Sequence, residues 1–287
     1  MSDTHPDALA LARHTEVIIL AAGLGSRLGP NTAARPKCLV PVNGTPILQR
    51  MVDSLLAHGV EGITVAIGYL GDQIRQFFAE RYAGLRVNFV ENPNYAATGS
   101  VFSLDLALDA VDPAAHLLLV EGDVVCEPEL IRRTFASAAQ ASALTVLSPY
   151  EPSLSGTFAL TGQGRVAAWL HESVRTPDFP LAESFKTVNI SFLRAGQPAQ
   201  ALRAAVKDTI VKGGVKAPLE YAMQDLVSQG LPIEALETTG LRWFEIDTPE
   251  DLAIAEDLFP PLDGSGSAGT AGAGLPAPGL PVAAALG

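Results

Sequence analysis

A glycine-rich turn with two basic side chains is the feature of this sequence whose chemistry is easiest to identify. Residues 17–22 form a short, apolar, β-branched run, and residues 23–27 follow it directly. Glycine lets backbone N–H groups approach phosphate oxygens, while guanidinium and ammonium groups add positive charge. The pattern predicts that a polyphosphate binds at the end of a buried strand. The candidate residues are Ala22, Gly23, Gly25, Ser26, Arg27 and Lys37.

Neither standard glycine motif accounts for this turn. A P-loop would end in Gly-Lys followed by Ser or Thr, and a dinucleotide fingerprint would open a helix with a third glycine. Gly29 is out of register for that third position. Judged by glycine spacing alone, a purely structural turn is an equal alternative.

Two carboxylates come at the ends of apolar, strand-like runs, at Asp123 and Asp247. Such a pair suits Mg²⁺, which binds carboxylate and phosphate oxygens together and keeps some of its water. We therefore predict that Asp123 and Asp247 are metal ligands. The alternatives are a solvated acid at Asp123 and a helix cap at Asp247, where Thr248 competes for that role. Glu245 shares the strand face of Asp247 and is a supporting candidate.

Lys186 and Asn189 lie in an apolar run, residues 186–192, that reads as a strand with polar residues embedded in it. Asn189 is a candidate to hold a substrate or a metal-bound water. A lysine at the start of a strand is more often merely exposed, and that is the alternative for Lys186.

The elements that must position these residues alternate between strands and helices. This alternation favours an α/β fold with a mostly parallel sheet, whose ligand site lies beyond the carboxyl ends of the strands. A hairpin is expected over residues 158–170, and together with the residues after it this hairpin should form one side of the ligand site. The other expected strands are 17–22, 63–67, 85–90, 117–120, 143–147, 186–192, 232–238 and 241–246, and the expected helices are 46–58, 72–81, one ending near 110, 128–139, 196–207, 217–229 and 248–258.

Composition limits the classes of partner. The chain has 287 residues with 48% hydrophobic and 17% charged content, and it has no apolar run of the about 20 residues that span a membrane. A formal net charge of −12 argues against nucleic-acid and anionic-membrane partners, because both carry the same sign of charge. Two cysteines without metal-type spacing, and no signal-like N-terminus, favour the cytoplasm.

Three segments are expected along the chain. Residues 1–14 form an N-terminal arm or short helix without assigned function, and residues 15–259 form one catalytic domain. Residues 260–287 consist mostly of Gly, Ala, Pro and Ser, so we predict a disordered tail. A tether to a further domain is the alternative for this tail, and a homodimer is the oligomeric state that we keep open.

Three N-terminal motifs together resemble a known signature. They are Leu-Ala-Ala-Gly-Leu-Gly-Ser-Arg-Leu at 20–28, Arg-Pro-Lys-Cys-Leu-Val-Pro-Val at 35–42 and Gly-Thr-Pro-Ile-Leu at 44–48. They resemble the start of the nucleotidyltransferases that make NDP-sugars and CDP-alcohols. The resemblance implies a Rossmann-like fold of the nucleotide-diphospho-sugar transferase type, with a small β-rich insertion that binds the acceptor. It also implies that the glycine loop wraps a nucleoside triphosphate and that Lys37 contacts phosphate.

Later motifs are similar to the phosphocholine and phosphonate cytidylyltransferases. The segment from Asn92 to Leu104 resembles one that closes over the nucleotide, which implies nucleotide contacts for Asn92, Thr98 and Ser100; here Gly99 and Ser100 stand where that branch has two asparagines. An N-cap at Thr98 in a plain turn is the alternative. The other matching motifs are Glu-Gly-Asp at 121–123, Lys-Thr-Val-Asn at 186–189 and Trp-Phe-Glu-Ile-Asp-Thr at 243–248.

The resemblance implies that CTP and a small phosphonate or phosphomonoester give a CDP-linked product and pyrophosphate. The acceptor's own oxygen attacks, so no protein nucleophile is needed. Arg27, Lys37 and Lys186 would carry the catalysis, and Asp123 and Asp247 match the family's Mg²⁺ ligands. Acceptor-binding roles are implied for Lys186, Asn189, Trp243 and Glu245.

Two alternatives and one choice of acceptor remain open. The alternatives are a sugar-1-phosphate uridylyl- or thymidylyltransferase and a non-catalytic nucleotide-sensing subunit. A phosphocholine acceptor would favour aromatic faces around its quaternary ammonium, and 2-aminoethylphosphonate would favour carboxylates. Aromatic candidates are Tyr150, Phe158, Trp169, Phe185, Tyr221 and Trp243, and carboxylate candidates are Glu172, Glu183 and Glu220.

Overall fold

The computed structural model describes residues 6–261. Nearly all of the predicted tail, residues 260–287, therefore lies outside the described residues. At the other end the predicted arm forms helix α1 (Pro6–Arg13), which packs against helix α5 (Pro128–Ala138) and buries Leu11 and Ala12 in the core.

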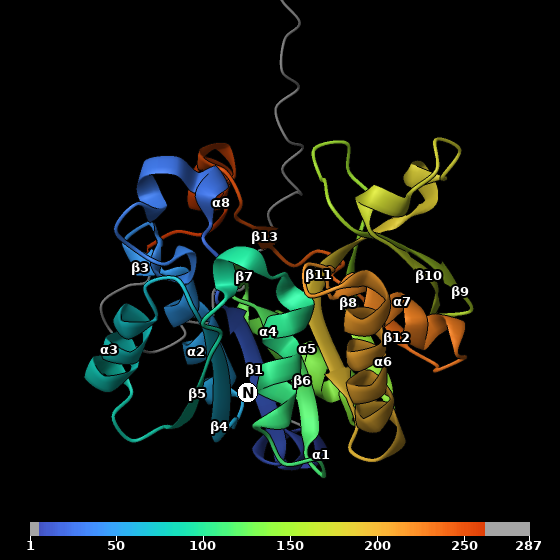
Figure 1. Cartoon of the computed structure of the whole chain (residues 1–287), viewed down its shortest axis with the longest axis horizontal. Helices are drawn as coiled ribbons and strands as arrows, with labels where there is room; N and C mark the ends of the chain where they lie inside the picture. Colours follow the sequence, from blue (N-terminus) through green and yellow to red (C-terminus); the bar gives the residue numbers. More distant parts are fainter. Residues whose placement is uncertain (1–5, 262–287) are drawn as a thin grey trace, which may run out of the picture.

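A nine-stranded sheet runs through the molecule in the order β5-β4-β1-β6-β11-β8-β12-β10-β9 (Figure 1). Its first half is parallel, as the alternation of strands and helices predicts, and helices cross between its strands. This half consists of β1 (Thr15–Ala21), β4 (Gly62–Ile67), β5 (Arg86–Glu91) and β6 (His116–Glu121), connected through α2 (Ile47–Ala57), α3 (Gly71–Arg81) and α4 (Ser100–Asp109).

The second half of the sheet is mixed. Strand β11 (Phe185–Leu193) is antiparallel to both of its main neighbours, β6 and β8 (Ala143–Pro149), and β12 (Glu234–Glu237) returns parallel to β8. The predicted hairpin is present as β9 (Phe158–Gly162) and β10 (Arg165–Leu170). It continues the edge of the main sheet, and β9 also pairs with β11. The β-rich part of the acceptor side is thus joined to the core by backbone hydrogen bonds.

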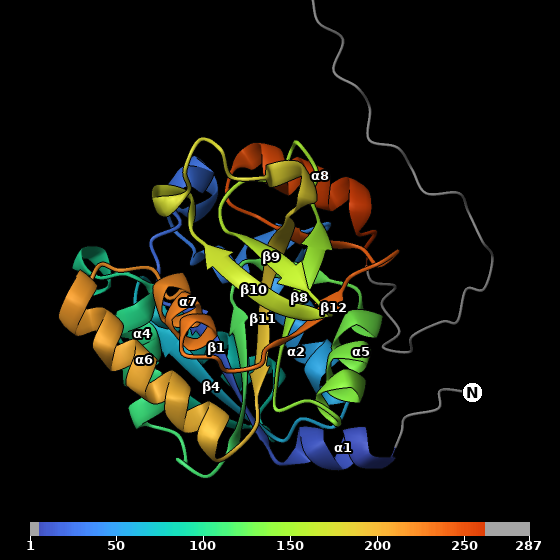
Figure 2. The same cartoon turned by 90° about the vertical axis from the view of Figure 1, so that its right-hand side faces the viewer.

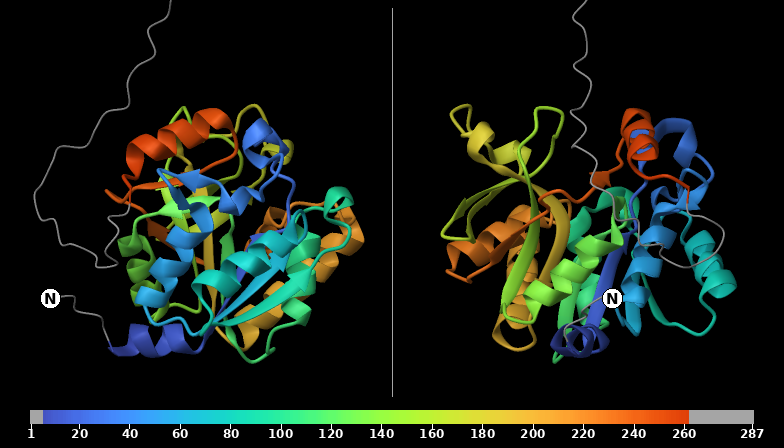
Figure 3. Two further views of the ribbon diagram at one scale, coloured as in Figure 1. Left: turned by 90° about the vertical axis from the view of Figure 1, so that its left-hand side faces the viewer. Right: turned by 180° about the vertical axis from the view of Figure 1, so that it is seen from behind.

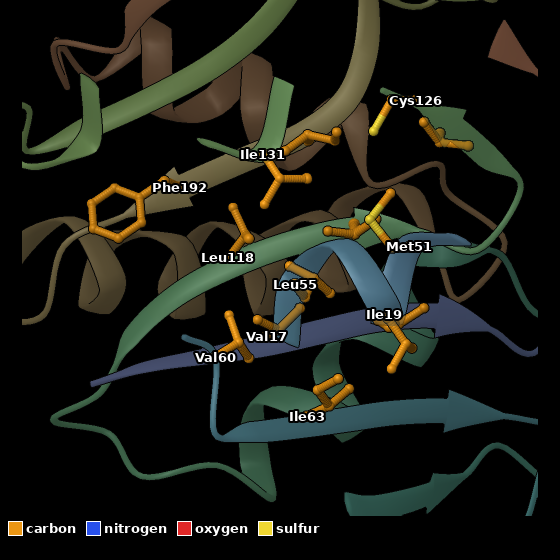
Figure 4. Close-up of a cluster of buried hydrophobic side chains, with 14 of the residues drawn as sticks. Val17, Ile19, Met51, Leu55, Val60, Ile63, Leu118, Cys126, Ile131 and Phe192 are labelled. Carbon is orange, nitrogen blue, oxygen red and sulfur yellow. The ribbon is translucent and has the colours of Figure 1, made fainter. Parts of the chain in front are cut away.

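Helices cover both faces of the sheet (Figure 2). Helices α1, α2 and α5 share one apolar cluster with the sheet, part of which is shown in Figure 4, and α4, α6 (Gln197–Gly213) and α7 (Glu220–Ser228) share another. Helix α6 is longer than the predicted 196–207, because Gly214, with φ of 78°, is the first residue that leaves the helical conformation. Burial of apolar side chains on both faces explains why the central strands read as continuous apolar runs.

A smaller layer lies over one end of the sheet. Strand β7 (Val124–Cys126) pairs antiparallel with β13 (Trp243–Glu245), and helix α8 (Pro249–Leu258) follows. The predicted cap of α8 is confirmed: Thr248 Oγ1 accepts from Asp251 N at 3.2 Å, and Asp251 Oδ2 accepts from Thr248 N at 2.8 Å. Helix α8 lies beside the segment after β1 (Figure 3). The short elements are β2 (Pro41–Val42), β3 (Thr45–Pro46) and the 3₁₀ turns η1 (Ser26–Thr32), η2 (Lys37–Leu39), η3 (Tyr95–Ala97), η4 (Glu172–Val174) and η5 (Leu181–Glu183).

Among residues 6–261, no helix combines the length and apolar character needed to cross a lipid bilayer.

Candidate active site

A cavity of about 510 Å³ opens beyond the carboxyl ends of β1 and β6, the edge at which the parallel strands of an α/β sheet place a ligand. It lies between the glycine loop on one side and the segments around β9, β10 and β11 on the other. Most of the residues predicted from the sequence line it. These are Ala22, Gly23, Gly25, Ser26, Arg27, Lys37, Thr98, Ser100, Asp123, Lys186, Asn189, Glu245 and Asp247.

The glycine loop is shaped around Lys37. Gly25 has φ of 61°, and a Cβ at this position would lie 2.9 Å from Cβ of Lys37. Thr32 Oγ1 donates to the carbonyl of Gly25 at 2.9 Å and holds the turn. A residue with a side chain at position 25 would be strained and would push on the lysine, so this glycine is required by both conformation and space.

Lys37 forms the centre of the first charged cluster. Its Nζ lies 2.5 Å from Asp123 Oδ2 and 2.6 Å from Asp247 Oδ1, and Arg27 Nη2 donates to the same Asp247 oxygen at 2.8 Å. Burial works to lower the pKa of Lys37, but the charges of the two aspartates and their hydrogen bonds outweigh it and hold this pKa above its ordinary value. Lys37 is therefore cationic at neutral pH.

Lys186 forms the centre of a second cluster and is more deeply buried, with 3% of its side chain exposed against 16% for Lys37. Its Nζ lies 2.7 Å from Glu245 Oε2 and donates to the carbonyl of Thr187 at 3.0 Å. The charge of Lys186 lowers the pKa of Glu245, but burial outweighs it and raises this pKa. The ion pair is thus desolvated, and its two partners depend on each other.

Asn189 connects the second cluster to the strand ends. The register of β11 against β8 shifts between Thr187 and Ser191, and within this bulge Asn189 has a left-handed backbone, with φ of 62°. Asn189 Nδ2 donates to Glu121 Oε2 at 3.1 Å and to Glu245 Oε1 at 3.0 Å. A bulge turns a side chain out of the strand's regular alternation, and here it directs the amide towards two carboxylates.

The cavity carries more acidic than basic side chains. Burial, and then the charges of Asp123, Glu220 and Glu245, raise the pKa of Glu121 well above its usual range. Glu121, Asp123 and Glu245 each offer a carboxylate oxygen within 4.8 Å of the others, and Asp123 Oδ1 is buried without a hydrogen-bond partner among the described residues. Oxygen ligands grouped in this way fit a hard divalent cation. The acidic residues that line the cavity are Glu121, Asp123, Glu172, Glu220, Glu245 and Asp247, and the Lys and Arg residues are Arg27, Lys37 and Lys186.

Two of the predicted site residues lie outside the cavity lining. Asn92 is 1% exposed, and its amide donates to Thr98 Oγ1 and to Ser103 Oγ, both at 2.9 Å. Trp243 is 8% exposed and packs in the core, because it is paired with Cys126 in the β7–β13 ladder. The structure therefore gives Asn92 a structural role, in which it holds Thr98, and separates Trp243 from the acceptor side.

The unusual Gly99–Ser100 pair has a structural explanation. A Cβ at Gly99 would lie 2.5 Å from the carbonyl oxygen of Ala217, and the N–H of Gly99 donates to Val215 O at 2.8 Å. Ser100 Oγ accepts from the N–H of Leu219 at 3.0 Å. This pair ties the start of α4 to the segment that precedes α7, so a larger residue at position 99 would not fit.

Several lining residues were not singled out by the sequence for the roles that their contacts suggest. The sequence pattern led to no predicted role for Glu121. Alternation along the strand end would nevertheless have placed its side chain at the same edge as that of Asp123. Thr157 donates to Glu220 Oε1 at 3.1 Å, and His171 lines the same side of the cavity. Thr157 and His171 stand in segments with no motif, so the pattern of the sequence offers no signal for them.

Comparison with known proteins agrees with this geometry. Residues 17–176 match the MobA-like NTP transferase domain family. The chain is 31% identical over 257 residues to a CMP-5'-(3-aminopropyl)phosphonate synthase from Streptomyces rubellomurinus. The aligned region covers 89% of this chain and 40% of that protein. It is 39% identical over 120 residues to a 2-aminoethylphosphonate cytidylyltransferase from Lancefieldella rimae, which covers 42% of this chain and 47% of that protein. The chain thus spans less than half the length of these two relatives.

Solved structures show the same fold. The CTP:phosphocholine cytidylyltransferase of Streptococcus pneumoniae superposes with a TM-score of 0.67 at 23% identity, covering 85% of this chain and 99% of that one. The inositol-1-phosphate CTP transferase of T. maritima has a TM-score of 0.69 at 19% identity, covering 84% and 93%. These likenesses confirm the predicted α/β fold of the nucleotide-sugar transferase type. The match to the family model over residues 17–176, which is more than half of the chain, shows that this chain belongs to the MobA-like NTP transferase domain family.

Proposed function

We propose that this chain transfers a cytidylyl group from CTP to a small phosphonate that carries a primary ammonium group. A phosphonate oxygen of the acceptor attacks the α-phosphorus of CTP, the new P–O bond forms as the bond to the β-phosphate oxygen breaks, and pyrophosphate leaves. The observation that carries the proposal is that one cavity holds two lysines, one partly buried and one buried, on separate carboxylates. Two anionic substrates that must approach each other each need a nearby cation.

Lys37 serves the triphosphate in this proposal. It lies under the glycine loop, whose backbone N–H groups suit phosphate oxygens, and Arg27 lies beside it with 70% of its side chain exposed. The names of the two relatives, a CMP-linked product and a cytidylyltransferase, support cytosine as the base. Uridine and thymidine nucleotides are the alternatives, and a comparison of triphosphates in one turnover assay separates them from CTP.

The acidic excess of the cavity supports Mg²⁺ as the cofactor. A triphosphate would meet like charge here unless a divalent cation came with it, and the carboxylate oxygens match the ligands that Mg²⁺ prefers. Asp123 and Asp247 both reach the point now held by the ammonium of Lys37, so they are the residues that would hold the ion. When bound, the ion neutralises phosphate charge as the bond to pyrophosphate breaks.

The acceptor half favours a primary ammonium over a quaternary one. None of the six aromatic candidates for choline recognition lines the cavity, and the lining has one Phe, Tyr or Trp ring, Tyr95, within residues 6–261. Glu172 and Glu220 do line it, and neither forms an ion pair with any part of the chain between residues 6 and 261. A carboxylate accepts the N–H bonds that a primary ammonium offers and a trimethylammonium lacks. Glu183, the third carboxylate candidate, is exposed outside the cavity.

Pyrophosphate release tests the reaction directly. The purified chain would be assayed with Mg²⁺, with CTP, UTP or dTTP, and with 2-aminoethylphosphonate, phosphocholine or ethylphosphonate. We expect CTP with 2-aminoethylphosphonate to give the highest kcat/KM. No release from CTP with any of these acceptors would overturn the proposal, and equal use of ethylphosphonate would overturn its ammonium part.

A matched pair of variants sharpens the acceptor assignment. We expect Glu220→Gln to raise the KM for 2-aminoethylphosphonate about 10-fold or more, as for a lost charge-assisted contact, and to leave the KM for ethylphosphonate unchanged. Glu183→Gln removes an exposed carboxylate from the same region and should change neither. An equal rise for both acceptors in Glu220→Gln would mean that Glu220 supports the cavity without contacting the ammonium.

A further inference from the structure

Residues 214–219, which we call the α6–α7 linker, lie against the start of α4. Helix α6, from which the linker leads, packs against both α4 and α7 (Figure 2). The carbonyl of Val215 accepts a hydrogen bond from the N–H of Gly99 at 2.8 Å. The N–H of Leu219 donates to Ser100 Oγ at 3.0 Å. Hydrogen bonds near both of its ends therefore fasten the linker to the first residues of the α4 segment.

Gly99 allows the linker to lie this close to α4. Its φ of −97° is open to any residue, so the backbone conformation does not require a glycine here. The lack of space does require one, because a Cβ on Gly99 would lie 2.5 Å from the carbonyl oxygen of Ala217 and 2.6 Å from that of Lys216. Both oxygens belong to the backbone and cannot turn aside as the end of a flexible side chain can. Any other residue at position 99 would therefore displace the linker.

The linker leads directly to Glu220, the carboxylate that contacts the acceptor's ammonium in the function proposed above. Ala217 precedes Glu220 by three residues, and Pro218 follows Ala217. Proline fixes its own φ and restricts the residue before it to extended conformations, so the backbone has little freedom to absorb a shift of Ala217. Pro218 and Glu220 both line the active-site cavity. The position of the Glu220 carboxylate thus depends on how closely the linker approaches Gly99.

Glu220 has a carboxylate oxygen available for an acceptor. Thr157 Oγ1 donates to Glu220 Oε1 at 3.1 Å, whereas Oε2 accepts no hydrogen bond from the described part of the chain. Glu220 is partly exposed in the cavity that it lines. The carbonyl of Thr157 accepts from the N–H of Thr187, the neighbour of Lys186, at 3.2 Å. A shift of the linker would therefore change the separation between the carboxylate of Glu220 and the ammonium of Lys186.

We propose that Gly99 is a positioning residue that determines acceptor specificity through Glu220. Its missing side chain lets the α6–α7 linker lie against α4, and this contact sets Glu220 at the distance from Lys186 that suits a phosphonate with a primary ammonium. Ser100 supports the same position through its hydrogen bond with Leu219. The inference rests on the function proposed above, and it adds that a segment on the nucleotide side of the cavity also selects the acceptor.

Steady-state kinetics of Gly99→Ala test the proposal. The KM is measured for CTP, for 2-aminoethylphosphonate and for ethylphosphonate, which lacks the ammonium. We expect the KM for 2-aminoethylphosphonate to rise about 10-fold, as for a weakened charge-assisted contact, and the KM for ethylphosphonate to stay unchanged. Gly84→Ala is the control, because no described atom beyond its chain neighbours lies within 4 Å of the added Cβ. A rise in the KM for CTP alone would refute the proposal, because Gly99 would then serve the nucleotide.

A double variant shows whether Gly99 acts through Glu220. In Glu220→Gln the charge that holds the ammonium is already absent. Adding Gly99→Ala to this variant should therefore change the KM for 2-aminoethylphosphonate about 2-fold or less. If the two effects instead multiply, Gly99 acts through some other group and the proposal is wrong.

Ser100→Ala keeps the proposal testable if Gly99→Ala does not fold. This variant adds no atom and leaves the N–H of Leu219 without its acceptor. The preference for 2-aminoethylphosphonate over ethylphosphonate should fall about 2- to 10-fold, the usual range for one lost hydrogen bond. Ser100→Thr, which keeps the hydroxyl, should restore it. An unchanged preference in Ser100→Ala would contradict the proposal, whatever happens to the KM for CTP.

The wild type separates failure of this inference from failure of the proposed function. A wild type that does not distinguish 2-aminoethylphosphonate from ethylphosphonate refutes the ammonium part of that function, and the role of Gly99 with it. A wild type that does distinguish them, with the same preference in Gly99→Ala and Ser100→Ala, refutes the role of Gly99 alone.

Discussion

The two lysine clusters of the active-site cavity differ in how they are built, although both draw on the same two chain segments. Glu245 and Asp247 lie two residues apart, yet Glu245 pairs with Lys186 and Asp247 pairs with Lys37. The two acids at the end of β6 are also split between the clusters. Asp123 contacts Lys37, and Glu121 accepts a hydrogen bond from Asn189. Two pairs of acids thus supply both halves of the cavity, which keeps the halves adjacent and distinct.

The two clusters also differ in how easily their lysine side chains can move. Lys37 lies under a glycine loop and is shared between two aspartates, so a cation that arrives with the triphosphate can take its place. Lys186 is almost fully buried and has one carboxylate partner and one carbonyl partner. We infer that the Lys37 side rearranges when substrate binds, while the Lys186 side is preformed.

The largest expected effect comes from the acid of the Lys37 cluster. Asp123→Asn should lower turnover about 100- to 1,000-fold, the usual cost of removing one preorganised electrostatic contact in an active site. Chelation of divalent cations should abolish turnover, and Mn²⁺ binding followed by electron paramagnetic resonance should weaken in the variant. Asp72→Asn, which alters a fully exposed side chain, is the control. Wild-type Mn²⁺ affinity in Asp123→Asn would refute the assignment of this residue as a metal ligand.

The next effect tests the division between the lysines. Lys37→Ala should weaken CTP binding, measured alone by calorimetry, and Lys186→Ala should raise the acceptor KM with CTP binding nearly intact. Loss of a charge-assisted contact costs about 1.5 to 3 kcal/mol, or roughly 10- to 100-fold. Equal loss of CTP binding in both variants would contradict the assignment of Lys37 to CTP and Lys186 to the acceptor.

Lys186→Ala has a second consequence, because it leaves the partly buried carboxylate of Glu245, 20% exposed, without its cation. Removal of one partner of a buried ion pair destabilises a fold by about 3–5 kcal/mol, and the exposure of Glu245 puts the expected cost at the low end of that range. The double variant Lys186→Met and Glu245→Gln removes both charges and should recover most of the lost Tm while the acceptor KM stays high. A recovered KM would mean that Lys186 acts through stability alone.

A smaller effect is expected at the glycine loop. Gly25→Ala places a Cβ 2.9 Å from that of Lys37 on a backbone with φ of 61°. The strain should cost about 1–2 kcal/mol of stability and raise the KM for CTP several-fold, with the acceptor KM unchanged. Gly23→Ala is the stability control, because nothing in the protein lies within 4 Å of its added Cβ. An equal loss of Tm in both variants would show that the positive φ of Gly25 is not the reason why a glycine is needed at this position.

The sequence predicts the Lys37 side better than the Lys186 side for a physical reason. The glycine loop and Lys37 lie in one continuous motif after a buried strand, and strand burial leaves a clear apolar run. Asn189 reaches its carboxylates through a bulge with positive φ, which a period-two pattern does not reveal. Trp243 was predicted to bind the acceptor from its place in a family motif beside Glu245. Its pairing with Cys126 in the β7–β13 ladder is a long-range event, and there the ring is buried.

The order of the elements was predictable, and their pairing was not. The alternating strands and helices of the first half appear with shifts of a residue or two at their ends, because caps and apolar periods are local signals. The antiparallel insertion of β11 between β6 and β8 depends on contacts between distant segments. So does the pairing of β7 with β13, which brings the run carrying Asp247 next to Asp123.

The smallest expected effect lies at the opposite end of β6 from the cavity and should leave both lysine clusters untouched. His116 Nδ1 accepts from the N–H of Ala195 at 3.0 Å, and its ring stacks on Phe192 with centroids 6.0 Å apart. Burial, and then the charges of Arg194 and His14, lower the pKa of His116. The folded state thus favours the neutral ring, so the stability that depends on it is fully present above the unfolded pKa of about 6.5 and is lost as the pH falls from that value through the lower pKa of the folded state. We expect Tm to fall between pH 7.5 and 5.5 by a few degrees more in the wild type than in His116→Gln, whose amide oxygen keeps the acceptor without a titrating group. Calorimetric scans at both pH values measure this difference, and turnover at pH 7.5 should be the same in the two proteins. The same dependence of Tm on pH in both proteins would show that His116 titrates as it does in the unfolded chain.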